Sequence, residues 1–411
     1  MTQTRRDNGS GTVRLRKDGR WEGRYTYGRS LKGKPLVKYF YGSTEREVKA
    51  IMRKFQKEIP NLPQIEPTTM SVGEYMKFYL YVVKFGTIKQ SSFDRLEKTN
   101  DNYVNPFLGE MPLNKLEADD IQELLNRMIV KYSVSTIKKV YELLNQALKY
   151  AAGRKYVPAD LMQLVRVPVA RDEGVKPIKS VEVLTDEEVK CLLSITEDDA
   201  APDGENAKKN KNLWKLIQLY IFMLNTGIRC GEMLALTFDD INLDDGYVRI
   251  NKNLSKVTER DKEHPEQKTG KVITIVTSPK SKCGIRTIPL NETAKLAVRR
   301  IIQYNKKNGV RTNNVATTFD GDVLNETYFS KRLHAILNRF CPGYFATSSH
   351  KSIHSLRHTF ASMCIRRDID IKVLSELLGH SSTSFTYNRY VHIIQEQKAK
   401  AIKMLDIYSD L

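Results

Sequence analysis

The sequence lacks the patterns of membrane proteins, secreted disulfide scaffolds and zinc sites. No run of 18 or more apolar residues occurs, so we expect no membrane-spanning helix. Residues 1–12 lack the apolar stretch of a secretory signal. The five cysteines are odd in number, irregularly spaced and without a CxxC pair, which argues against a disulfide framework and against zinc. A reducing, cytoplasmic setting is therefore expected.

Cofactor signatures are missing as well. No carboxylate cluster has the spacing of a metal site, and no glycine-rich phosphate loop occurs. Internal repeats and low-complexity tracts are also absent from the sequence. We expect neither a metal ion nor a bound cofactor.

Positive charge, in contrast, is abundant. The formal net charge is +19, from 67 basic and 48 acidic residues, which favours a polyanionic partner such as nucleic acid. Residues 1–60 hold 16 Lys or Arg but only 6 Asp or Glu, which is more than half of the whole excess. The alternative is a soluble basic protein with a solvated surface.

The length of 411 residues suggests two or three domains, and the basic front segment predicts the first. Residues 13–16 and 21–27 are expected to be strands joined at an Asp-Gly turn, and 37–41 a third strand. A capping box at Thr44–Glu47 then opens a helix that should cover one face of the sheet.

The strand alternation places basic side chains where they could line one exposed sheet face beside Tyr or Trp rings. These residues are Arg14, Arg16, Arg24 and Lys38. A small sheet of this kind can enter the major groove of DNA. The alternative is an ordinary solvated face.

The middle of the chain has a helical pattern between two linkers. Prolines make 60–67 extended, and 167–180 is a second proline-containing linker. Between them, apolar residues at helical spacing predict helices around Val72, Ile121 and Ile137. On its own, this segment indicates only a small helical domain.

The last part of the chain mixes helices with a small sheet. A capping box at Thr185–Glu188 predicts the first helix, and 210–227 predicts a largely buried helix that ends at its glycine. Strands are expected at 248–250 and 272–276. The polar segment 256–270 is expected to be an exposed excursion.

Six residues of this part could together cleave a phosphodiester. Such a reaction needs a nucleophile in line with the leaving oxygen, positive groups that stabilise the negative charge of the non-bridging oxygens, and a proton for the leaving oxygen. The candidates are Arg229, Lys280, His354, Arg357, His380 and Tyr390.

The two arginines are the proposed phosphate clamp, because a guanidinium group presents paired donors and stays charged. Arg229 follows a predicted helix end, and Glu232 could brace it. His354 and Arg357 are three residues apart and share a helix face. His358 is expected to lie off that face and to be structural.

The remaining roles are a proton acceptor, an oxygen stabiliser, a nucleophile and a general acid. We assign proton acceptance to His354 and oxygen stabilisation to His380. Tyr390 is the proposed nucleophile, with Tyr387 one turn earlier as its rival. Lys280 is the proposed general acid for the 5′ oxygen, with Lys282 as its rival.

These motifs resemble those of tyrosine recombinases, the phage-type integrases. The motifs are TGIRCGE (226–232), PKSKCGIRTIPL (279–290), HSLRHT (354–359) and LLGHSSTSFTYNRYVH (377–392). The resemblance is strongest over 180–411 and closest to integrases of conjugative transposons. Ser281 and Gly284 depart from the usual Thr and Ser, which puts loop detail in doubt rather than activity.

The resemblance implies a multidomain α+β protein. Its parts would be a three-stranded sheet with a helix that binds arm-type DNA sites (1–62), a helical core DNA-binding domain (68–166), and a mainly α-helical catalytic domain with a small β-sheet (180–411). Within the last domain, 391–411 would be a tail passed to a neighbouring protomer, or alternatively a helix folded on its own domain.

The resemblance also implies the reaction. DNA would be cut and rejoined through a 3′-phosphotyrosine link, which conserves the energy of the broken bond without metal or nucleotide. Four protomers would act on double-stranded DNA to insert and excise a mobile element, with a possible accessory excision or bending factor. The alternatives are a monomeric tyrosine topoisomerase and a DNA-binding regulator that keeps the fold without chemistry.

The charge predicts that DNA binding depends strongly on salt. Phosphate contacts by Lys and Arg release counterions from DNA. The affinity for duplex DNA, measured in a salt titration, should therefore fall steeply as the salt concentration rises. A salt-insensitive affinity would contradict binding through a basic groove and arm.

Overall fold

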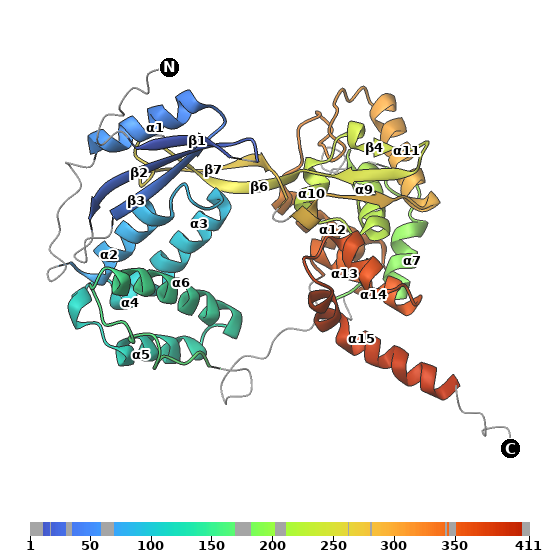
Figure 1. Ribbon diagram of the computed structural model, residues 1–411. Helices are drawn as coiled ribbons and strands as arrows, with labels where there is room; N and C mark the ends of the chain where they lie inside the picture. The colour runs from blue at the N-terminus through green and yellow to red at the C-terminus, as the bar shows by residue number, and fades with distance from the viewer. Residues whose placement is uncertain are drawn as a thin grey trace. The chain divides into compact units, whose positions relative to one another are not determined.

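The computed structural model describes residues 11–16, 18–29, 35–58, 70–168, 182–201, 211–261, 263–279, 282–341, 343–344 and 351–404. The chain divides into two compact units, Met1–Ile178 and Lys179–Leu411, and each is described by itself (Figure 1). The expected linker 60–67, and with it the boundary between the first two expected domains, lies outside the described residues. Most of the linker 167–180 does so too.

The front of the first unit is the expected three-stranded sheet. Its elements are β1 (Thr12–Leu15), β2 (Trp21–Arg29), β3 (Pro35–Gly42) and α1 (Glu45–Glu58). The strands are antiparallel in the order β1-β2-β3. The apolar side of α1, with Val48, Met52 and Phe55, forms a small core with Phe40 of the sheet. The Asp-Gly turn is confirmed, with Gly19 at φ +80°.

The rest of the first unit is helical. Its elements are α2 (Val72–Phe78), the π-helical turn η2 (Tyr79–Lys84), α3 (Gln90–Thr99), η3 (Asn100–Val104), α4 (Asn105–Leu108), η4 (Leu113–Lys115), α5 (Ala118–Ile129) and α6 (Val134–Gly153). A capping box between Ser71 and Glu74 starts α2, because each satisfies a backbone N–H of the other. The helices predicted around Val72, Ile121 and Ile137 are confirmed as α2, α5 and α6, and they share one apolar core.

The second unit is built around α9 (Leu213–Thr226), a helix buried along nearly all of its length. Its other helices are α7 (Asp186–Ser194), α10 (Cys230–Ala235), η6 (Phe238–Asp240), η7 (Lys282–Gly284), α11 (Glu292–Lys307), α12 (Glu326–Phe340), α13 (Ile353–Arg366), α14 (Ile371–Leu378) and α15 (Thr383–Met404). Helices α7, α11, α12 and α13 pack against α9. The capping box at Thr185–Glu188 and the end of α9 at Gly227 are confirmed.

In the described part of this unit, the strands form two separate sheets. The strands β4 (Ile241–Asn242), β5 (Tyr247–Ile250) and β8 (Arg286–Pro289) form one sheet, and β6 (Asn253–Arg260) and β7 (Lys268–Thr277) form a two-stranded sheet. Both ends of the expected exposed excursion 256–270 belong to these two strands, and its exposure is confirmed for β7. Backbone hydrogen bonds pair the two strands, and they need no apolar side chains.

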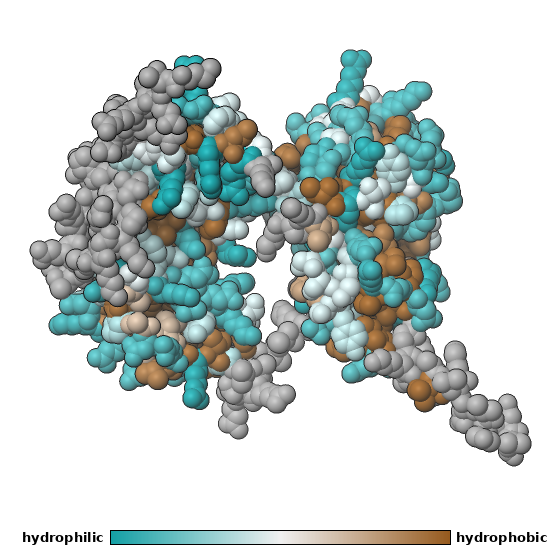
Figure 2. All heavy atoms as spheres, in the orientation of Figure 1, coloured by the Kyte–Doolittle hydropathy of each residue, from teal (hydrophilic) through white to brown (hydrophobic). Residues whose placement is uncertain are grey.

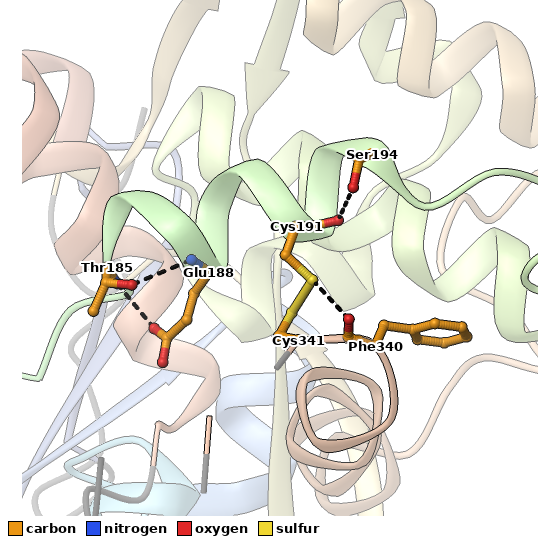
Figure 3. Close-up of a disulfide and its surroundings, with 6 residues drawn as sticks. All are labelled: Thr185, Glu188, Cys191, Ser194, Phe340 and Cys341. Atoms are coloured by element: carbon orange, nitrogen blue, oxygen red, sulfur yellow. Dashed lines mark hydrogen bonds between the residues drawn. A yellow bond between two sulfur atoms is a disulfide. The ribbon is translucent and has the colours of Figure 1, made fainter. Parts of the chain in front are cut away.

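A disulfide lies in the second unit, although the number and spacing of the cysteines argued against a disulfide framework. Cys191 on α7 is bonded to Cys341 after α12, with Cα atoms 5.7 Å apart (Figure 3). The two cysteines are 150 residues apart. Spacing could not reveal this pair, because it is set by how α7 packs on the end of α12.

The helices α13, α14 and α15 form a small core of their own in the second unit. Figure 2 shows hydrophilic residues over most of the visible surface of this unit, with apolar residues gathered around α14 and the start of α15. Val373 and Phe385 are 48% and 56% exposed there. Within the described ranges, no helix is both long and apolar enough to cross a membrane.

Breaking the disulfide should destabilise the second unit. Cys191→Ser is expected to lower its free energy of unfolding by about 2–5 kcal/mol, because a cross-link over a long loop restricts the unfolded chain. Denaturant unfolding with and without a thiol reductant measures this. Cys283→Ser, which changes an exposed free cysteine, is the control and should keep wild-type stability. Equal stability of Cys191→Ser and the wild type would contradict the prediction.

Candidate active site

The turn after α9 places Arg229. Gly227 ends the helix in the left-handed region (φ 62°), which favours glycine. A Cβ atom at this position would lie 2.4 Å from the ring of Phe360, so the backbone also approaches too closely for a side chain. The chain then enters α10 with Arg229 at its N-cap, and the Arg229 side chain is 35% exposed.

The buried carboxylate of Glu232 bonds to both Arg229 and a second arginine, Arg286. Glu232 accepts hydrogen bonds from the backbone N–H of Arg229 (2.9 Å) and from its Nη1 (2.8 Å). Arg286 of β8 donates to both oxygens of the same carboxylate, at 3.1 and 2.9 Å. Burial alone would raise the pKa of Glu232, but the hydrogen bonds and charge of Arg286, with the charge of Arg229, outweigh it and lower the pKa to about 2.

Three arginines meet at the end of α14. The last carbonyl groups of a helix have no partner within the helix and carry its negative dipole end. Here each of three successive carbonyl oxygens accepts a hydrogen bond from a guanidinium group. The bonds are Arg286 to Leu377 (2.6 Å), Arg357 to Leu378 (2.6 Å) and Arg229 to Gly379 (3.1 Å). The segments expected to carry the clamp therefore converge on one helix terminus.

Arg357 is nearly fully buried in the second turn of α13. Besides Leu378, its Nη1 donates to the carbonyl of Gly227 at 2.7 Å, which ties α13 to the turn after α9. Burial and the neighbouring charge of Arg229 lower the pKa of Arg357 to about 9. The guanidinium group thus stays charged at neutral pH.

His380 follows the left-handed Gly379 and has a defined tautomer. Arg357 Nη2 lies 2.9 Å from His380 Nε2, and a guanidinium group can only donate, so Nε2 accepts. The proton is then on Nδ1, which donates to the hydroxyl of Thr386 at 2.7 Å. Burial and the charges of Arg357, Arg229 and Arg286 lower the pKa of His380 to about 3, so the ring is neutral.

Tyr390 is buried and hydrogen-bonded to a histidine. It is 1% exposed and packs within the core of α13, α14 and α15. Its hydroxyl lies 2.8 Å from Nδ1 of His358. Burial raises the pKa of Tyr390 to about 12, although the charges of Arg357 and Arg389 act in the opposite direction. Its backbone (φ −119°, ψ 19°) interrupts the helical geometry of α15.

The histidine beside Tyr390 is not the one that the sequence favoured. His354, the expected proton acceptor, lies in the first turn of α13 with an exposed side chain, and partial desolvation and the charge of Arg357 lower its pKa. His358 was expected to be structural and off the face of His354. The spacing of four residues should have indicated otherwise, because residues i and i+4 lie on one face of a helix.

The second residue missed by sequence reasoning is Arg286, which appeared only as part of a motif. The proposed general acid, Lys280, lies outside the described residues, as does the side chain of its rival Lys282. Within the described part of the chain, no group of three or more His, Cys, Asp or Glu residues is arranged to hold a metal ion.

The basic residues of the front sheet divide between its two faces. Arg14 and Arg16 both bond to the buried Glu22. Strand pairing puts Arg24 on this same face, opposite Tyr39. Lys38, however, was misplaced: its Nζ lies 4.1 Å from the ring centre of Phe55 on α1, at the helix-covered face. Only three of the four expected residues share the open face.

Comparison with known proteins gives the family. The phage integrase family profile matches residues 182–397, and the profile of the N-terminal SAM-like domain of phage integrases matches residues 71–129. The chain belongs to the phage integrase family. It is a tyrosine recombinase, and it resembles the integrases of conjugative transposons.

Two relatives illustrate this. A tyrosine recombinase XerC-like protein of Caldanaerobacter subterraneus subsp. tengcongensis is 28% identical over 393 residues, which cover 93% of this chain and 94% of the relative. The transposase from transposon Tn916 of Enterococcus faecalis is 24% identical, over 73% of this chain and 69% of the relative.

Solved structures share the fold of this integrase. The Tn1549 transposon integrase in complex with a circular intermediate DNA matches with a TM-score of 0.62 at 18% identity, over 81% of this chain and 100% of that chain. A lambda integrase tetramer bound to a Holliday junction matches with a TM-score of 0.53 at 17% identity, over 94% and 96% of the two chains.

The depressed pKa of Glu232 predicts acid sensitivity. Since its folded-state pKa is about 2, against an ordinary value of 4.5, the ionised carboxylate stabilises the fold above pH 4.5 by about 3 kcal/mol. This contribution is lost as pH falls from 4.5 toward 2. Glu232→Gln should therefore be less stable than the wild type at pH 7 by about 3 kcal/mol.

Denaturant unfolding of both proteins along a pH series measures this difference. It should narrow below pH 4.5, because a protonated carboxyl and an amide are both neutral. A difference that stays constant down to pH 2 would show that Glu232 does not act through its charge.

Proposed function

We propose that this recombinase inserts and excises a mobile element by attack of Tyr390 on the scissile phosphate. The attack forms a 3′-phosphotyrosine bond and releases a 5′ hydroxyl, and reversal with a new 5′ hydroxyl rejoins DNA. The observation that carries the proposal is Arg357, which hydrogen-bonds to His380 and whose charge acts on Tyr390. A phosphate anion can accept charge-assisted hydrogen bonds from guanidinium groups that lie close together in this way.

Arg229 and Arg357 would bind the non-bridging oxygens. A phosphate at this point brings negative charge beside His380, which counteracts the cations that now depress its pKa. Nε2 can then gain a proton and donate it in a hydrogen bond to a phosphate oxygen. His380 thereby becomes an oxygen stabiliser only when DNA is bound.

The same reasoning applies to the nucleophile. We propose that the proton of Tyr390 passes to His358, which is already within hydrogen-bond distance. His354, at the exposed start of α13, is then free to contact a phosphate oxygen. Lys280 remains the proposed general acid that protonates the 5′ oxygen as the P–O bond breaks. Because Tyr390 is 1% exposed, attack requires α15 to shift, and the non-helical backbone at Tyr390 is where it can bend.

Double-stranded DNA would contact two surfaces of the protein. Core-type DNA would bind at the catalytic residues of the second unit, and the helical domain of the first unit is itself proposed to bind DNA. The arm-type site would lie against the open face of the front sheet, where Arg14 is 73% exposed at its side chain and Tyr39 and Tyr41 are 45% and 44% exposed. The Arg16 guanidinium group lies 5.6 Å from the centre of the Tyr41 ring on this face, a cation–π contact.

Assembly into a tetramer on DNA is also part of the proposal. The tail begins within α15, where Ile393 is buried against its own domain but Ile402 is 68% exposed. The exposed residues Val373 and Phe385 offer an apolar surface for the tail of a neighbouring protomer. We further propose a cytoplasmic location and an accessory factor for excision.

Tyr390→Phe should abolish covalent attachment to DNA while leaving DNA affinity unchanged within about threefold. Phenylalanine fills the same buried volume but has no nucleophilic oxygen. The measurement uses a nicked duplex that traps cleavage, without metal or nucleotide, and a denaturing gel that separates protein–DNA adduct from free DNA.

Tyr387→Phe is the matched control, because Tyr387 lies one turn earlier on α15 and is 38% exposed. It should form the adduct like the wild type. An adduct that persists in Tyr390→Phe would refute the assignment of the nucleophile. If the wild type binds the duplex but forms no adduct, a DNA-binding regulator becomes the better account.

A further inference from the structure

Arg286 is the most extensively bonded arginine of the site, yet no proposed step uses it. Its side chain is 6% exposed. Nε donates to the Leu377 carbonyl, Nη1 to Glu232 and to the Gly284 carbonyl (3.2 Å), and Nη2 to Glu232. All three guanidinium nitrogens are thus engaged by the protein. Nη1 and Nη2 of Arg286 are already paired with a carboxylate, whereas those of Arg357 donate to carbonyl groups and His380, so Arg286 is poorly placed to bind a phosphate itself.

Its partners, however, lead directly to the phosphate-binding groups. Through Glu232, Arg286 fixes the carboxylate that holds both the backbone and the side chain of Arg229. Through the Leu377 carbonyl, it fixes the last turn of α14, three residues before His380. One side chain thus connects the two sides of the proposed clamp.

The backbone at Gly379 is shaped around this side chain. A Cβ atom at Gly379 would lie 3.1 Å from both Cδ and Nη1 of Arg286 and 2.9 Å from the Cys283 carbonyl oxygen. Gly379 also has φ 63°, a conformation that L side chains rarely adopt. Two features therefore favour glycine before His380: the left-handed backbone at the end of α14 and the close approach of the Arg286 side chain.

We propose that Arg286 is a positioning residue, which holds Arg229 and His380 in the arrangement that binds the phosphate in the transition state. It acts through Glu232 and the end of α14, without touching DNA. This inference rests on the proposed function of the site. Lysine cannot replace it, because a single ammonium group cannot bridge a carboxylate and a carbonyl with the geometry of a planar guanidinium group.

Arg286→Lys should slow adduct formation without weakening DNA binding. Measured as a single-turnover rate at saturating protein, adduct formation should fall about 100-fold, the scale of losing one preorganised donor in an active site. The Kd for the same duplex should change less than about threefold, since most phosphate contacts remain. Arg249→Lys is the matched control, because Arg249 is an exposed arginine on β5 of the same sheet and should keep the wild-type rate.

A sulfur-containing substrate tests which part of the site Arg286 serves. Replacing the bridging 5′ oxygen by sulfur removes the need for a general acid, because a thiolate leaves without a proton. Arg286→Lys should remain slow on this duplex, since its defect lies in the phosphate clamp. Lys280→Met should regain most of its rate. If the rate of Arg286→Lys recovered on the sulfur duplex, the proposal would be overturned, because Arg286 would then act by positioning the general acid Lys280.

Glu232→Gln provides a second variant that keeps the test decisive if Arg286→Lys folds poorly. Because the two residues act as a unit, Glu232→Gln should show the same loss of rate, and the double variant should be no slower than the slower single variant. Additive losses, or wild-type rates in Arg286→Lys, would overturn the proposal. The absence of an adduct from the wild-type protein would instead refute the proposed function.

Discussion

The site depends on the hydrogen bonds from three guanidinium groups to successive carbonyl oxygens at the end of α14. Three cations at one helix terminus repel one another. Burial and the charge of Arg229 lower the pKa of Arg357, which reflects part of this repulsion. The negative end of the helix dipole and the buried carboxylate of Glu232 offset it. In the proposed mechanism, a bound phosphate adds a second anion to this arrangement.

In the proposed mechanism, the same charge arrangement also sets the protonation state of the site before DNA binds. Burial and the charges of Arg357, Arg229 and Arg286 lower the pKa of His380, and burial raises the pKa of Tyr390 above its ordinary value. His358 is held neutral in the same way, because burial and the charges of Arg389, His354 and Arg357 lower its pKa to about 4. A bound phosphate acts on the same balance in the favourable direction, since it raises the proton affinity of both imidazoles.

Local signals in the sequence predicted much of this architecture, because they depend on neighbouring residues. Capping boxes, the left-handed glycine at 227, and the front hairpin are of this kind. The pairing of Arg286 with Glu232 across 54 residues and the disulfide across 150 could not be predicted, because tertiary packing creates both. Lys38 lies on the helix-covered face because α1 packs on that side of the sheet, and the sequence does not show which side α1 covers. His358 was different: its spacing from His354 carried the signal, and our reading of that spacing was wrong.

The central claim is that the oxygen of Tyr390 carries the 3′ end of cut DNA. The most direct test is to form the adduct on a nicked duplex, digest the DNA and the protein, and sequence the modified peptide by mass spectrometry. The account predicts a nucleotide attached through its 3′ phosphate to Tyr390, and a free 5′ hydroxyl on the released strand. A nucleotide on Tyr387, a link through a 5′ phosphate, or a modified residue outside α15 would contradict it.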